Sequence, residues 1–94
     1  MNEKLKNKAM DQLFSCILRL KTVDECYAFF DDICTVHELQ ALSQRLEVAI
    51  MLRQGKTYIE IGELTGASTA TISRVNRSLH YGADGYSIVL GRKE

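Results

Sequence analysis

The sequence predicts a small all-helical domain that contains a helix-turn-helix. Along most of the 94 residues, apolar side chains recur at intervals of three and four, which is the spacing of one helix face. The pattern Thr-x-x-Glu, typical of a capped helix start, occurs three times. Gly66 separates two apolar patterns in the second half, and proline is absent. A chain this short makes one domain at most.

The first predicted helix covers about residues 4–19. Its apolar positions form a wide stripe, in which Phe14 and Leu18 lie beside the main line of Leu13 and Ile17. A stripe this wide favours contact with more than one neighbouring helix, as in the shared core of a dimer. The alternative is an ordinary core helix of a monomer.

Two further helices are predicted over about residues 23–33 and 36–54, because Thr22 and Thr35 are each followed by a glutamate three residues on. The second helix is expected to supply most of the aromatic core. Its inward side chains are predicted to be Cys26, Tyr27, Phe29, Phe30 and Ile33. The third helix is long enough to cross the domain and to carry the helix-turn-helix.

The hydrophobic content also favours a dimer. Hydrophobic residues make up 46% of this short chain. A thin monomer does not readily bury that much apolar surface, since small domains bury a limited fraction of it. We therefore expect a homodimer in which helices from both chains share one core.

The helix-turn-helix is predicted over residues 57–79. Thr57 and Glu60 form a capping box, so that a helix begins directly after Thr57. Ile61 and Leu64 supply its inward face. Gly62 is expected to let the second helix cross closely, because it has no side chain.

The second helix of the pair follows a glycine turn. Gly66 can adopt the left-handed conformation that ends a helix, and Ser68 is a favourable N-cap for the next one. Ala67, Ile72 and Val75 are predicted to face the first helix of the pair.

The remaining side chains of this second helix suit the major groove of double-stranded DNA. Small side chains permit close approach, hydroxyls donate or accept hydrogen bonds, and arginine binds phosphate or guanine. The predicted DNA-binding residues are Ser68, Thr69, Ala70, Thr71, Ser73, Arg74 and Arg77. The alternative is a short helical hairpin in a bundle whose polar face is simply hydrated.

The distribution of charge supports a local DNA-binding face. The formal net charge is zero, but residues 22–40 carry five acids and no Lys or Arg. Residues 45–81 carry five Lys or Arg and three acids. A basic face with an acidic region elsewhere is compatible with electrostatic DNA binding and limits non-specific affinity.

After Gly82, which is expected to end the recognition helix, residues 83–94 form a short C-terminal segment. Residues 86–90 lie between glycines and include β-branched side chains, so both a strand and a short helix are open. We expect a short helix because the rest of the chain is helical. The single domain 1–94 thus divides into dimerisation helices in residues 1–54, the helix-turn-helix and this segment.

Several classes of function are not supported. The three cysteines are odd in number, and no signal sequence, transmembrane run or lipidation motif is present, which favours a cytoplasmic protein with reduced thiols and no membrane partner. Cys34 and His37 have half of a zinc spacing, but no second pair follows, so no metal is expected. No catalytic set of carboxylates, no Ser/His/Asp group and no phosphate loop indicates an enzyme or a cofactor.

Two segments carry a family resemblance: ELQALSQR at residues 38–45 and LTGASTATISR at residues 64–74. The block 35–79 resembles the Trp repressor family, and the whole chain is similar to its TrpR-like YerC/YecD-type subgroup. The resemblance implies an intertwined homodimer that binds operator DNA with two helix-turn-helix heads. Residues 68–75 are also similar to the helix-turn-helix of other bacterial repressor families.

The resemblance also implies a ligand pocket. Thr35, Arg45, Arg74 and Ser78 match positions that surround the corepressor in the Trp repressor, whose indole lies between two arginines. Val75 replaces the glycine that makes room for the ring, so we expect an effector other than tryptophan, if one binds at all. The alternative is that Arg45 pairs with an acid of the dimer while Arg74 contacts DNA alone.

The sequence therefore predicts a sequence-specific DNA-binding transcriptional regulator that acts as a repressor and as a dimer. The alternative function is a protein-interaction module that uses the same fold to dock a component of the transcription machinery. Salt-dependent DNA binding favours the first, and a co-purifying protein without DNA affinity favours the second.

Overall fold

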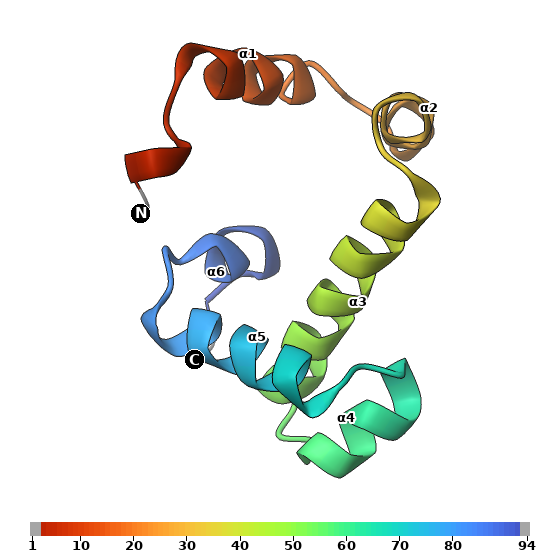
Figure 1. Ribbon diagram of the computed structural model, residues 1–94, viewed down its shortest axis with the longest axis vertical. Helices are drawn as coiled ribbons and strands as arrows, with labels where there is room; N and C mark the ends of the chain where they lie inside the picture. The colour runs from red at the N-terminus through yellow and green to blue at the C-terminus, as the bar shows by residue number, and fades with distance from the viewer. Residues whose placement is uncertain (1–2, 93–94) are drawn as a thin grey trace. The chain divides into compact units, whose positions relative to one another are not determined.

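The computed structural model describes residues 3–92, and every regular element in that range is a helix. Figure 1 shows the helices labelled along the chain. The elements are a 3-10 turn Glu3–Leu5 and the α-helices α1 Lys8–Ile17, α2 Val23–Ile33, α3 Val36–Arg53, α4 Tyr58–Thr65, α5 Thr69–Tyr81 and α6 Gly85–Leu90. The all-helical prediction is confirmed. Residues 1, 2, 93 and 94, which the predicted segments include, lie outside the described residues.

The first helix begins later than expected. The sequence predicted one helix over residues 4–19, but the structure has a single 3-10 turn and then α1. The side chain of Asn7 accepts a hydrogen bond from the backbone N–H of Met10 at 2.7 Å, which caps α1. Asparagine competes in this way with the helical backbone, and the apolar spacing does not reveal it.

The predicted starts of α2 and α3 are confirmed. Thr35 and Glu38 form a reciprocal pair at the start of α3, in which each backbone N–H donates to the other side chain, at 2.8 Å and 3.1 Å. At α2 the Thr22 hydroxyl accepts from the N–H of Glu25 at 3.0 Å, but Glu25 accepts from Lys21 instead of Thr22. Both helices thus begin where local capping chemistry predicts.

The chain divides into two compact units, residues 1–39 and 40–94. The described part of the first unit, residues 3–39, contains no buried side chain. Tyr27 and Ile33, expected to point to the interior, are 69% and 51% exposed in the single chain. Cys26 is exposed too, so within one chain the expectation is wrong for these three residues, whereas Phe29 and Phe30 are half-buried. Helices α1 and α2 alone form no enclosed core.

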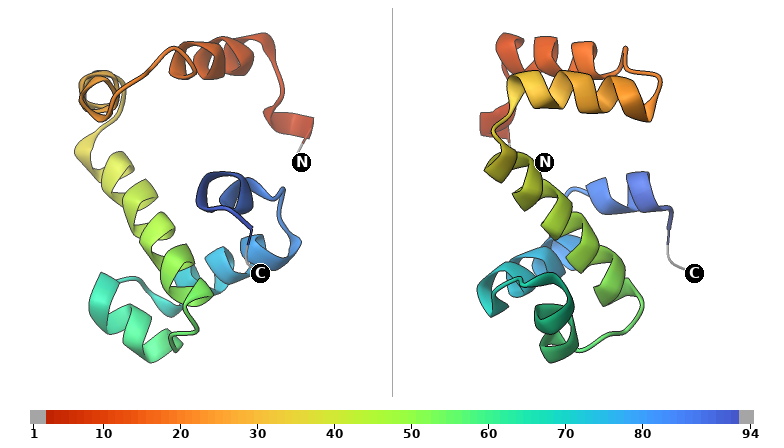
Figure 2. Two further views of the ribbon diagram at one scale, coloured as in Figure 1. Left: turned by 180° about the vertical axis from the view of Figure 1, so that it is seen from behind. Right: turned by 90° about the vertical axis from the view of Figure 1, so that its right-hand side faces the viewer.

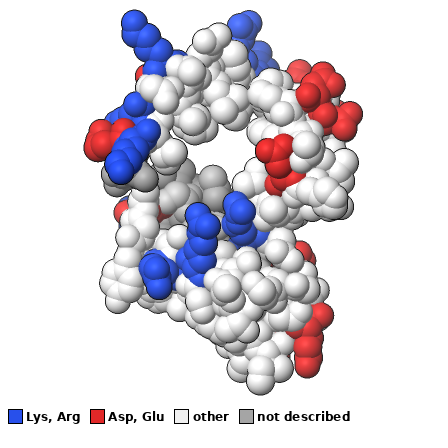
Figure 3. Space-filling view, in the orientation of Figure 1, with Lys and Arg blue, Asp and Glu red and all other residues white. Residues whose placement is uncertain are grey.

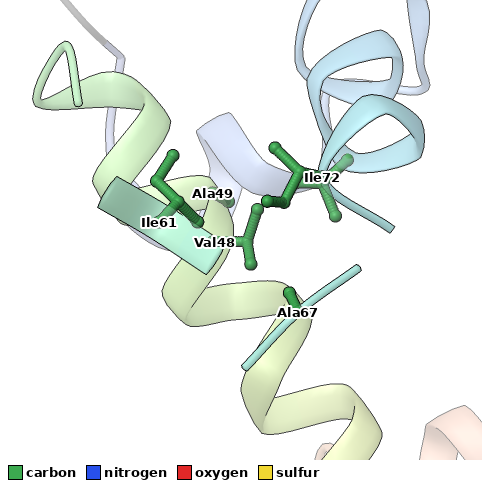
Figure 4. Packing of buried hydrophobic residues seen from close by; sticks show 6 residues of the cluster. Val48, Ala49, Ile61, Ala67 and Ile72 are labelled. Atoms are coloured by element: carbon green, nitrogen blue, oxygen red, sulfur yellow. The ribbon is translucent and has the colours of Figure 1, made fainter. Parts of the chain in front are cut away.

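The second unit contains the buried core. The views of Figures 1 and 2 show α4 and α5 packed against the C-terminal half of α3. The buried side chains between them come from α3, α4, the turn and α5: Val48, Ala49, Ile61, Ala67, Ile72 and Val75. Figure 4 shows this cluster and labels its members from Val48 to Ile72. The predicted inward positions Ala67, Ile72 and Val75 are therefore confirmed. Leu64, however, is 62% exposed, so its predicted inward position is wrong.

The expected short helix at the C-terminal segment is confirmed as α6. Asp84, in the left-handed conformation at φ 64°, precedes it. Tyr86 and Leu90 pack against the core of the second unit. The helix therefore lies against the same core that positions α5.

Candidate nucleic-acid interface

A complete capping box begins α4. The Thr57 hydroxyl oxygen accepts from the N–H of Glu60 at 3.2 Å, and a carboxylate oxygen of Glu60 accepts from the N–H of Thr57 at 3.2 Å. The Thr57 hydroxyl also donates to that carboxylate at 3.0 Å. These bonds, the backbone one first, lower the pKa of the Glu60 carboxyl. The predicted start of the helix-turn-helix is confirmed.

The turn between α4 and α5 has the predicted glycine. Gly66 adopts φ 74° and ψ 5°, and its N–H donates to the carbonyl oxygen of Gly62 at 2.9 Å. A side chain with a Cβ is strained in this left-handed region, so glycine suits the position. Gly62 does not play its predicted role, since a Cβ there would meet only the Ala67 carbonyl oxygen, at an ordinary 3.5 Å.

Two further residues hold the turn, and sequence reasoning missed both. The Thr65 hydroxyl donates to the Ile61 carbonyl oxygen at 2.7 Å and accepts from the N–H of Ala67 at 3.1 Å. Gln44 Nε2, on α3, donates to the Thr65 carbonyl oxygen at 3.1 Å. A threonine just before the turn glycine could have predicted these bonds, because its hydroxyl can bind nearby backbone groups. The Gln44 contact spans 21 residues and has no such signal.

Ser68 is the N-cap of α5, as predicted. Its hydroxyl accepts from the N–H of Thr71 at 3.1 Å and donates to the Thr71 hydroxyl at the same distance. Both residues were predicted to contact DNA. Their hydroxyls already bind each other, so their first role is to fix the start of the helix.

Helix α5, the predicted recognition helix, has two distinct faces. Ile72 and Val75 are 1% and 2% exposed and belong to the core. Among the predicted DNA-binding residues Thr71 is half-buried, and the others are exposed: Ser68, Thr69, Ala70, Ser73, Arg74 and Arg77. The same helix thus anchors itself on one side and presents small, hydroxylated and cationic side chains on the other.

The charge on the outer face of α5 is not neutralised. No acid occurs in α5, and within residues 3–92 the side chains of Arg74 and Arg77 form no hydrogen bond or ion pair. Figure 3 shows Lys and Arg side chains over the part of the molecule that α5 forms, with no acidic side chain between them. Two free guanidinium groups on one helix face are suited to phosphate or guanine.

The predicted pocket residues occupy different environments. Arg45 is half-buried and makes no hydrogen bond or ion pair within the described residues, and Ser78 is exposed. Val75 is buried in the core of the second unit. Thr35 belongs to the first unit, where its hydroxyl caps α3. The pocket residues of the second unit thus come from α3 and α5.

Other kinds of site have no support in the described part of the chain. Between residues 3 and 92, no three His, Cys, Asp or Glu side chains group in a way that could hold a metal ion. Cys16, Cys26 and Cys34 are free thiols. None of the described helices is long and apolar enough to cross a membrane.

Comparisons with known proteins agree with this geometry. A family model described as Trp repressor protein matches residues 8–94. YerC of Bacillus subtilis (strain 168) is 61% identical over 90 residues, which cover 96% of this chain and 86% of that protein.

Two crystal structures are similar over nearly the whole chain. A TrpR-like protein from Eubacterium eligens ATCC 27750 has a TM-score of 0.91 and 61% identity, covering 99% of both chains. A putative Trp repressor from Staphylococcus aureus has a TM-score of 0.91 and 58% identity, covering 96% of this chain and 91% of that one. The chain therefore belongs to the Trp repressor family.

Proposed function

We propose that this protein is a transcriptional repressor that binds double-stranded DNA as a homodimer. The family consists of DNA-binding regulators and not of enzymes. The observation that carries the proposal is the outer face of α5, where Arg74 and Arg77 are exposed and unpaired within residues 3–92. The opposite face of α5 is fixed in the core by Ile72 and Val75. In the proposed complex α5 enters the major groove, and the protein acts in the cytoplasm.

In the proposed complex, the exposed hydroxyl of Thr69 contacts base edges while Arg77 binds phosphate. A base contact carries sequence information, whereas a phosphate contact does not. Replacing the two residues should therefore produce different defects.

The test measures DNA binding of the variants Thr69→Ala and Arg77→Ala by fluorescence anisotropy, on sites selected from a random pool and on random DNA. Thr69→Ala should lose about 1–3 kcal/mol on the best site and little on random DNA. Arg77→Ala should weaken both alike and reduce the salt slope by about one unit for each lost phosphate contact. If both variants bind like the parent at every salt concentration, α5 does not read DNA.

The homodimer is supported by the first unit. Residues 3–39 contain no buried side chain, and Leu18, Val23 and Tyr27 are each more than two-thirds exposed. Apolar surface of this extent on helices is typical of an interface. Light scattering should give twice the 10.6 kDa chain mass. Tyr27→Glu should shift it toward the monomer, whereas Tyr81→Glu, at a site 87% exposed in the second unit, should not.

An effector, where one acts at the family pocket, is proposed to be a molecule other than tryptophan. The support is Val75, whose buried side chain adds bulk at the position where the family has glycine. Arg45 and Arg74 remain available, since neither pairs with an acid within residues 3–92.

One observation favours the second candidate function, docking of a protein of the transcription machinery. On α4, Ile59 and Leu64 are 76% and 62% exposed, which is unusual for a helix that approaches DNA phosphates. Ile59→Glu would abolish such docking. If DNA affinity is absent even at low salt, and a partner is retained by the parent but lost by Ile59→Glu, the docking function replaces the proposed one.

A further inference from the structure

A hollow of about 170 Å³ lies between the C-terminal part of α3, the C-terminal part of α5 and α6. All the residues that line the hollow belong to the second unit. Its lining comprises Leu52, Arg53, Asn76, Leu79, His80 and Ser87. None of these residues is among the predicted DNA-binding residues or the family pocket residues.

Arg53 is the charged group of this hollow, and the fold does not use its charge. The residue is half-buried, and its guanidinium forms no hydrogen bond or ion pair within residues 3–92. A partly desolvated cation normally has an acceptor, because loss of water without a replacement bond is unfavourable. The geometry thus calls for an anion at Arg53.

Further donors surround this position. The side chains of Asn76 and Ser87 are half-buried and, in the described range, form no hydrogen bond. His80 Nδ1 lies 2.8 Å from the Asn76 backbone carbonyl oxygen. A carbonyl only accepts, so Nδ1 carries the proton and Nε2 of the neutral ring is an acceptor, which leaves Asn76 and Ser87 as the neutral donors beside Arg53. One cation from α3 and three polar groups from α5 and α6 therefore border one small space.

The rest of the lining is apolar. Leu52 and Leu79 are partly buried and pack against the core. Arg53 also borders a second hollow of about 290 Å³, whose other lining residues are Ile50, Gln54 and Leu90. Arg53 thus lies between a polar space and a more apolar one.

We propose that this place binds a small organic acid. Its carboxylate lies against the Arg53 guanidinium and accepts from Asn76 or Ser87, while a short apolar body covers Leu52 and Leu79. Drug-sized ligands occupy roughly 300–1,000 Å³, so a hollow of about 170 Å³ limits the occupant to a small molecule. The same carboxylate chemistry is offered by an Asp or Glu of a second copy of this chain, and the test separates the two sources.

The experiment titrates the ¹⁵N-labelled full chain with hexanoate and follows backbone amide signals by NMR. Hexan-1-ol supplies the apolar body without the charge, and inorganic phosphate supplies charge without the body. Hexanoate should cause saturable shifts at Asn76, His80 and Ser87, and the other two probes should bind more weakly or not at all. The absence of saturable shifts with hexanoate would overturn the proposal.

Variants assign the binding to this hollow. Arg53→Gln should weaken hexanoate about tenfold or more, because it removes hydrogen bonds to a charged group. Ser87→Ala should weaken hexanoate binding less than Arg53→Gln does. It tests the same site if Arg53→Gln disturbs folding. Arg92→Gln, at an exposed arginine outside both hollows, is the matched control and should bind hexanoate like the parent. Equal binding by parent, Arg53→Gln and Ser87→Ala would contradict the assignment.

Binding of an Asp or Glu from a second copy of the chain would give a different result. If an acid of a second copy occupies the hollow, hexanoate leaves the signals unchanged and Arg53→Gln weakens self-association in sedimentation. That result overturns the small-molecule site. No DNA is present in these measurements, so their outcome does not depend on whether the protein binds DNA.

Discussion

Gln44 on α3 donates from Nε2 to the carbonyl oxygen of Thr65, the last residue of α4, at 3.1 Å. This bond satisfies a carbonyl at a helix end, where no intrahelical partner is available. It also ties the turn of the helix-turn-helix to the long helix that supports it. The orientation of α5 relative to α3 therefore depends on a side chain outside the helix-turn-helix.

Gln44→Ala should lower the free energy of unfolding by about 1 kcal/mol, because the partly buried Thr65 carbonyl loses its donor. Urea unfolding measures this change. Gln40→Ala is the control, since Gln40 is exposed on the same helix and its side chain makes no hydrogen bond within residues 3–92. Equal stability of the two variants would show that the tie is not formed in solution.

Ser68 permits a separation of folding from DNA binding. Ser68→Ala should cost about 1 kcal/mol of stability, because the N–H of Thr71 loses its acceptor. Ser68→Asp should keep the stability, since aspartate caps as well as serine, but should weaken DNA binding by repulsion from phosphate. Thermal unfolding and fluorescence anisotropy give the two readouts. If Ser68→Asp binds DNA like the parent, this end of α5 lies away from phosphate.

Tryptophan should not bind the protein at micromolar concentrations, because the Val75 side chain is 2% exposed and fully packed. Titration calorimetry tests this directly. Val75→Gly should gain affinity where the variant remains folded, which circular dichroism checks. Micromolar binding by the parent would mean that Val75 does not occupy the place of the ring.

The stability of α4 should decline in acid. The pKa of the Glu60 carboxyl is lowered from 4.5 because Thr57 donates to its charged form, first from the backbone and then from the hydroxyl. A lowered folded-state pKa gives stability that is present above the unfolded value and is lost as the pH falls through the folded one.

Glu60→Gln should therefore reduce the loss of thermal stability between neutral pH and pH values below about 4.5. Glu63→Gln, at an exposed carboxylate on the same helix without a hydrogen bond in the described range, is the control. A parallel pH dependence of the two variants would show that the capping box does not contribute.

Capping chemistry made much of the fold predictable. Thr35, Thr57, Ser68 and Gly66 act through bonds to residues three or four positions away, so a short stretch of sequence contains all that determines them. Asn7 acts in the same local way, but the continuous apolar spacing around it concealed the break.

Burial was less predictable than helix position. The apolar periodicity marks one face of α2, but it does not say whether the covering surface belongs to the same chain, and Tyr27 is exposed in one chain. At the candidate interface, the sequence placed Ile72 and Val75 on the inner face of α5, and both are buried. The outward positions of the same helix could be predicted from these two. The Gln44 contact could not be predicted, since it joins residues far apart in sequence.

The lack of buried side chains in the first unit makes its folding depend on the concentration of the protein. Residues 3–39 bury no side chain of their own, so they gain little from folding until another surface covers them. The core of the second unit forms within one chain. In the proposed homodimer, dilution would therefore act on the first unit only: it would separate the two chains while the core of each second unit stays intact. The concentration of the protein would then decide whether two DNA half-sites are bound together or one is bound alone.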